Sequence, residues 1–123
     1  MFSSEFDAKV QAAGGMEEYY KLSQKEELEA HKHALAEIDP SIDPLSDPFN
    51  RIGYHSAWIQ HIENLFSVYE SLSQAGVKVS FIGLTHTMQD FATSVLLPMK
   101  ELLDQGSVDD AVALYKQPRH YNR

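Results

Sequence analysis

The chain has 123 residues, the usual size of one domain. It carries 18 Asp and Glu residues against 10 Lys and Arg residues, a formal charge of -8. Nucleic acids and anionic membranes are bound by concentrated positive charge, so this balance argues against both as partners. The sequence contains no cysteine, which excludes disulfides, thiolate metal sites and a cysteine nucleophile. No apolar run approaches the ~20 residues of a membrane span, and no signal-peptide pattern begins the chain, so we expect a cytoplasmic protein.

The negative charge is concentrated in the first part of the chain. Residues 1–48 contain 11 acidic and four basic residues, whereas residues 49–123 contain seven acidic and six basic residues. This asymmetry indicates either a solvated helix surface or a face that binds a basic partner. The candidate partner-binding acidic face consists of Glu17, Glu18, Glu26, Glu27 and Glu29.

Apolar residues at helical spacing predict two helices before residue 39. The first covers about residues 4–13 and ends at Gly14 and Gly15. The second covers about residues 16–38 and has an inward stripe that contains Leu28, His31, Leu35 and Ile38.

Residues 39–48 contain three Asp-Pro pairs at intervals of four. Proline has no donor N–H and restricts the preceding residue to extended geometry, so this segment is expected to be a locally stiff connection. Its last pair predicts a helix start, with Asp47 as N-cap and Pro48 in the first helical position.

Three further helices are expected after this connection. The third runs from about Pro48 to Ala75, has a wide apolar face and ends at Gly76. The fourth begins near Ser80, with a kink or restart at Pro98. A short last helix follows residue 107, and residues 117–123 form a loose tail. Three long and two short helices predict a single all-α domain, packed as an antiparallel bundle.

His31 and His55 are the candidate ligand or metal site. At 100° per residue, both histidines fall on the apolar faces of their helices and point inward, with Tyr54 and Trp58 beside them. Inward imidazoles can ligate a metal or act as acid and base near neutral pH. An inward histidine is also often a core residue hydrogen-bonded to a backbone carbonyl or a tyrosine hydroxyl. His33 lies about 200° from His31 and is expected to face solvent.

Known catalytic and metal-binding patterns are missing from the sequence. It has no Glu-x-x-His, His-Glu-x-x-His, EF-hand, phosphate-binding glycine loop or Gly-x-Ser-x-Gly motif. We therefore expect no cofactor, and these absences favour a protein without catalysis of its own.

Two classes of function fit these observations. The first is a small acidic helical protein that acts by protein–protein interaction, as an accessory subunit, inhibitor or adaptor, with a basic partner surface or a second copy of itself. The second is a metal- or ligand-binding bundle, a sensor or small enzyme, which uses His31 and His55 and requires them to approach each other. An acidic mimic of DNA is less favoured, because the C-terminal part of the chain is nearly neutral.

Overall fold

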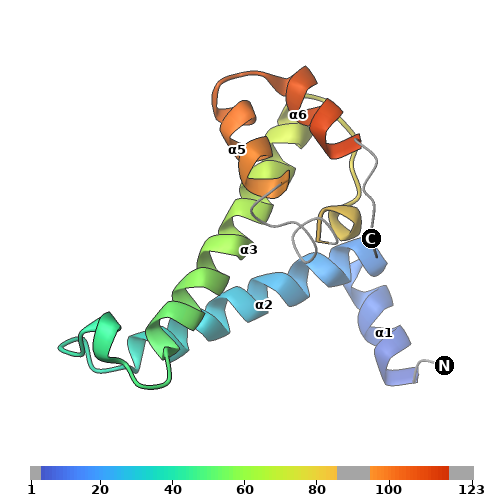
Figure 1. Cartoon of the computed structure of the whole chain (residues 1–123). Helices are drawn as coiled ribbons and strands as arrows, with labels where there is room; N and C mark the ends of the chain where they lie inside the picture. Colours follow the sequence, from blue (N-terminus) through green and yellow to red (C-terminus); the bar gives the residue numbers. More distant parts are fainter. Residues whose placement is uncertain (1–3, 86–94, 117–123) are drawn as a thin grey trace, which may run out of the picture. The chain divides into compact units, whose positions relative to one another are not determined.

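The computed structural model describes residues 4–85 and 95–116, and these residues are helical apart from their connections (Figure 1). They contain no β-strand, and the predicted all-α fold is confirmed. The antiparallel order and the number of long helices stay predictions. Residues 86–94 of the expected fourth helix, and the expected tail at 117–123, lie outside the described residues. The helices are α1 (Ser4–Ala13), α2 (Met16–Ala36), the 3-10 helix η1 (Pro44–Ser46), α3 (Arg51–Gln74), α5 (Leu97–Asp104) and α6 (Val108–Lys116).

The chain divides into two compact units, Met1–Glu63 and Asn64–Arg123, with the boundary inside α3. The assignment of the whole chain to a single domain stays a prediction. Nine of the ten buried apolar residues in the described part belong to the second unit.

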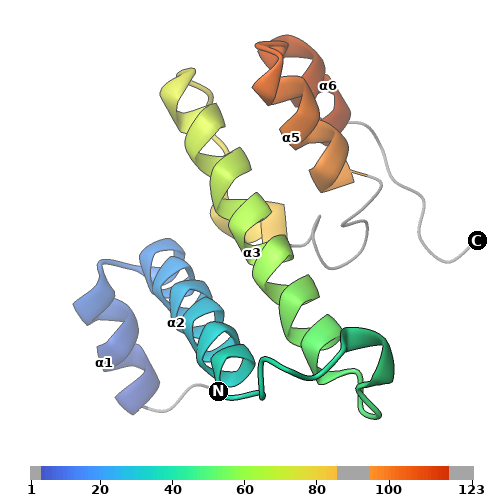
Figure 2. The same ribbon diagram turned by 90° about the vertical axis from the view of Figure 1, so that its left-hand side faces the viewer.

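The first unit begins with α1 folded back beside α2 (Figures 1 and 2). The Phe6 and Tyr19 rings meet edge to face, with centroids 5.2 Å apart. Helix α1 ends where it was predicted to end: Gly15 has a φ of +121°, which favours glycine, and its amide donates to the Val10 carbonyl at 2.9 Å. Neither α1 nor α2 contains a buried residue.

The three Asp-Pro pairs form three similar turns in the connection between α2 and α3. In each, the aspartate carboxylate accepts a hydrogen bond from the backbone amide two residues later, which is an Asx turn. The donors are the amides of Ser41 at 2.9 Å from Asp39, Leu45 at 3.0 Å from Asp43, and Phe49 at 3.4 Å from Asp47. The prolines restrict the same backbone, so the connection is ordered by local interactions.

Helix α3 begins at Arg51 rather than at the predicted Pro48. Asn50 has a φ of 50°, in the left-handed region, so the chain makes another turn before the helix starts. Asp47 still caps the first turn, because its carboxylate accepts from the Ile52 amide at 2.8 Å. This hydrogen bond is the main reason why the pKa of Asp47 lies below its ordinary value, and the nearby Arg51 charge acts in the same direction.

The second unit contains the main apolar core. The buried side chains come from α3, residues 81–85, residues 95–96, α5 and α6, and they are Leu65, Val68, Leu72, Phe81, Leu84, Val95, Leu96, Met99 and Ala111. Gly76 ends α3 as predicted, with a φ of +80° and a hydrogen bond from the Val77 amide to the Leu72 carbonyl. Ser80 caps the next helical segment through a 3.1 Å hydrogen bond from the Gly83 amide. Pro98 lies in the first turn of α5, where its missing N–H is tolerated, and the predicted kink or restart of the fourth helix stays a prediction.

Phe81 is central to this core, and its replacement by alanine is expected to be strongly destabilising. Its side chain is fully buried. The centroid of its ring lies 5.0 Å from the ring centroid of Phe66 and 5.4 Å from that of Tyr69. Phe81→Ala leaves a cavity and should lower the free energy of unfolding by about 3–5 kcal/mol. Urea denaturation followed by circular dichroism measures this change. Phe49→Ala is the matched control, because Phe49 is 80% exposed, and it should change the value by no more than about 0.5 kcal/mol.

Candidate histidine site

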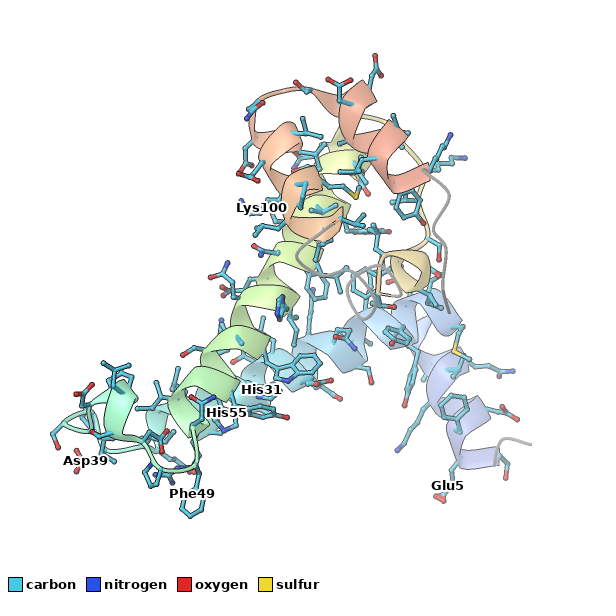
Figure 3. All side chains as sticks on the ribbon, viewed as in Figure 1. Glu5, His31, Asp39, Phe49, His55 and Lys100 are labelled. Carbon is cyan, nitrogen blue, oxygen red and sulfur yellow. The ribbon has the colours of Figure 1, made fainter. Side chains whose placement is uncertain are left out.

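His31 of α2 and His55 of α3 meet inside the first unit (Figure 3). Their Nδ1 atoms are 2.9 Å apart, within hydrogen-bond distance. The predicted approach of the two histidines is therefore confirmed, whereas a ligand-binding role stays a prediction. The partner of each ring is the other imidazole, rather than the backbone carbonyl or tyrosine hydroxyl of the alternative interpretation.

Two aromatic side chains of α3 surround the pair, as the sequence predicts. The Trp58 ring lies parallel to the His31 ring, with an interplanar angle of 4° and centroids 5.7 Å apart. The Tyr54 ring meets both imidazoles edge to face. The His31 side chain is 12% exposed, so most of it is removed from water by these contacts.

The short Nδ1–Nδ1 distance determines how hydrogen atoms are arranged in the pair. One Nδ1 must carry a hydrogen and the other must offer a lone pair, so the two rings take opposite roles. The Glu27 carboxylate lies 3.6 Å from Nε2 of His31 and favours a hydrogen on that atom. This arrangement makes the neutral His31 the acceptor at Nδ1 and His55 the donor. If both imidazoles were protonated, both Nδ1 atoms would carry a hydrogen and this hydrogen bond could not form.

The pair offers two nitrogen ligands to a metal ion. In residues 4–85 and 95–116, no group of three or more His, Asp or Glu side chains is arranged to hold an ion. A tetrahedral zinc site with Zn–N distances of ~2.0–2.1 Å would require the two Nδ1 atoms to move apart to roughly 3.3 Å. Its remaining ligands would come from water, a small ligand or a second copy of the chain.

The five glutamates of the predicted acidic face do not share one face of α2. At 100° per residue, Glu18, Glu26 and Glu29 fall within an arc of about 80°, whereas Glu17 and Glu27 lie on the opposite side. Glu27 contacts His31, and belongs to the histidine site. Helical periodicity could have shown this division from the sequence.

The three glutamates on the common side are exposed and only weakly neutralised. Glu18 pairs with Lys21 at 3.1 Å and Glu29 with Lys32 at 3.9 Å. Lys32 is shared, because it also contacts Glu63 at 3.5 Å. Exposed pairs of this kind contribute little stability, so the surface keeps a strong negative field.

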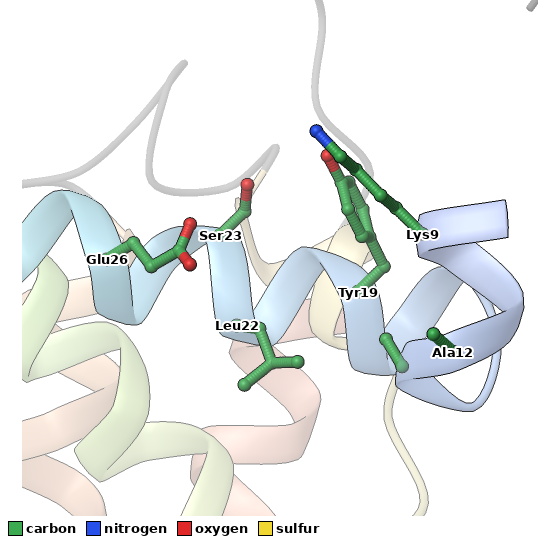
Figure 4. Close-up of a pocket in the computed structure, with 7 residues that line it drawn as sticks. Lys9, Ala12, Tyr19, Leu22, Ser23 and Glu26 are labelled. Carbon is green, nitrogen blue, oxygen red and sulfur yellow. The ribbon is translucent and has the colours of Figure 1, made fainter. Parts of the chain in front are cut away.

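A shallow pocket lies between α1 and α2 (Figure 4). It has a volume of about 360 Å³ and combines apolar walls with Lys9, Tyr19, Ser23 and Glu26. None of the residues that line it belongs to the histidine site, so the pair and the pocket are separate features of the first unit.

Two exposed apolar residues were missed by the sequence interpretation. Leu45 is 96% exposed and Phe49 is 80% exposed, the highest values among the large apolar side chains of the described residues. Each follows an Asp-Pro pair directly, and the repeated Asp-Pro-apolar spacing is the signal that could have identified them.

The comparisons with known proteins assign no relative to this chain. No protein-family model, no curated protein and no solved structure matches it. Within the described residues, no helix is both long and apolar enough to cross a membrane.

Trp58 should report the packing of the histidine pair by its fluorescence. It is the only tryptophan in the sequence, and it stacks on His31. His31→Ala removes the stacked ring and should expose Trp58 to more water, so the emission maximum should move to longer wavelength. Emission spectra recorded at one fixed pH measure this shift.

A variant of a second histidine on the same helix makes the measurement specific. His33→Ala should leave the emission spectrum unchanged, since His33 is exposed on another side of α2. An unchanged spectrum in His31→Ala would contradict the stacking of Trp58 on His31.

Proposed function

We propose that this protein acts by binding another protein, and that the exposed glutamates of α2 form part of the binding surface. The proposal rests on two features of the first unit, which is strongly acidic and whose first two helices bury no residue. Residues 1–63 contain 12 acidic and five basic residues, whereas residues 64–123 contain six and five. Helices α1 and α2 nevertheless contain no buried residue.

Exposed apolar side chains in the same unit support this proposal. Of the six large apolar residues that are exposed in the described part, five belong to residues 1–63: Met16, Leu22, Leu45, Phe49 and Tyr54. Apolar side chains beside a polar, charged surface are typical of protein interfaces. The strong negative charge favours a partner with a basic surface, and a cytoplasmic accessory subunit, inhibitor or adaptor is the class of protein that fits.

Neutralising Glu18, Glu26 and Glu29 should weaken partner binding. We would capture partners with the full chain, purify the captured protein, and compare wild type with the triple variant Glu18→Gln, Glu26→Gln and Glu29→Gln by isothermal titration calorimetry. The variant is expected to raise the Kd at least about tenfold and to reduce its dependence on salt, because charges across an interface act through a screened field.

The matched control removes the same number of charges from the second unit, through Glu70→Gln, Glu101→Gln and Asp109→Asn, all of which are exposed. It should bind within about twofold of wild type. Equal weakening by both variants would indicate a general charge effect, and no weakening by either would contradict the proposal. A partner that proves to be a second copy of this chain would make the protein a homodimer.

A second candidate function is metal binding by His31 and His55. The specific observation in its favour is that two nitrogen ligands from different helices lie 2.9 Å apart and partly shielded from water. Imidazole nitrogens are common ligands of zinc and copper. A bound ion would take the place of the hydrogen that the two rings share, so metal and proton would compete for the pair.

Titration with Zn²⁺ alone tests this second candidate. Calorimetry and NMR of the histidine rings should show saturable binding, with one ion per chain or per two chains, and binding should be lost in His31→Gln and in His55→Gln. His33→Gln is the control and should bind as wild type does. Binding that is absent in wild type, or that persists in both site variants, would reject a metal site at this pair.

A further inference from the structure

We propose that residues 39–50 form a preorganised docking loop, whose Leu45 and Phe49 side chains enter an apolar pocket with a basic rim on another protein. This inference rests on the proposed function and deepens it, because it identifies which apolar residues contact the partner and what chemistry the partner offers.

The loop presents these two side chains in a defined way. The amides of Leu45 and Phe49 each donate to the carboxylate of an aspartate two residues earlier, at 3.0 and 3.4 Å. Each of these aspartates is followed by proline, so the intervening backbone has little freedom. A loop that already holds its bound shape loses less conformational entropy on binding than a flexible one.

Because both side chains are largely exposed, they contribute little to the packing of the fold. Leu45 and Phe49 are 96% and 80% exposed, whereas the Ser41 and Ser46 hydroxyls donate to Asp39 and Asp43 within the loop's own turns. Two large apolar side chains, four residues apart on an ordered loop, match the few anchor residues that provide most of the energy of an interface.

The charge around the anchors indicates the chemistry of the partner. Glu37, Asp39 and Asp43 are exposed beside them, and the nearby Arg51 already lies 3.7 Å from the Asp47 carboxylate. A basic rim around the apolar pocket would complement this charge. A second copy would bring a second acidic loop, and an anionic membrane would repel this one, so a protein with a basic surface is favoured over both.

Serine substitutions at the anchors test the loop on the full chain. Leu45→Ser, and the double variant with Phe49→Ser, are compared with wild type for binding to the purified protein that wild type captures. The double variant should raise the Kd at least about thirtyfold, and Leu45→Ser alone at least about fivefold. Leu97→Ser is the control, since Leu97 is an exposed apolar residue in the other unit, and it should stay within twofold of wild type. Circular dichroism confirms that each variant is folded, and the single variant suffices if the double variant is not.

A photo-crosslinker at position 49 tests the chemistry of the partner. With p-benzoylphenylalanine in place of Phe49, crosslinks should map to apolar residues of the partner that are flanked by lysine or arginine. Crosslinks between two copies of this chain, or to an acidic or wholly polar surface, would overturn the inference. Unchanged affinity of the anchor variants would overturn it as well.

The results also separate this inference from the proposed function. If neutralising the α2 glutamates weakens binding but the anchor variants do not, only the loop is excluded. If the anchor variants weaken binding and the glutamate variant does not, the loop stands and the acidic surface of α2 is excluded. If wild type captures no protein, both proposals fail.

Discussion

Residues 1–63 bury few apolar side chains, and this limits how much the hydrophobic effect can stabilise them. Helices α1 and α2 contain no buried residue, and their contacts are between aromatic rings, ion pairs and the two imidazoles. A unit of this composition cannot depend on a large core for its stability. Large apolar side chains such as Leu45 and Phe49 therefore remain at the surface.

The contact between His31 and His55 joins two helices and also brings two imidazole groups together. His31 and His55 link α2 to α3 through a hydrogen bond that needs one donor and one acceptor. Trp58 and Tyr54 shield the contact, and Glu27 biases which ring accepts. The geometry that joins the helices therefore requires that the two rings are not both protonated, and the proposed metal ion would have to replace the hydrogen that they share.

The two units differ in their charge and in how their apolar side chains are divided between core and surface. Residues 64–123 have almost balanced charge, and among the described residues they contain nine of the ten buried apolar side chains, which form the core of that unit. Residues 1–63 have most of the acidic residues and, within the described part of the chain, most of the exposed large apolar residues. Charge repulsion within such a unit opposes compaction, and a basic partner would relieve it, which links the composition of the first unit to the proposed interaction.

Much of the local structure was determined by the sequence alone. The helical class, the stops at Gly15 and Gly76 and the cap at Ser80 follow from periodicity and from residues with special backbone requirements, which act over a few positions. The inward direction of His31 and His55 also follows from 100° per residue. These features need no knowledge of how distant segments pack.

Other features were decided only by the tertiary structure. Periodicity places each histidine on a face, but it does not give the rotation and displacement between two helices, and the 2.9 Å contact depends on both. Asn50 adopts the left-handed region, so α3 begins only at Arg51. The residue types around Pro48 gave no indication of this extra turn. Burial is likewise a property of the whole fold: Leu45 and Phe49 are as apolar as Leu65 and Phe81, and only their surroundings leave the first two in water and place the others in the core.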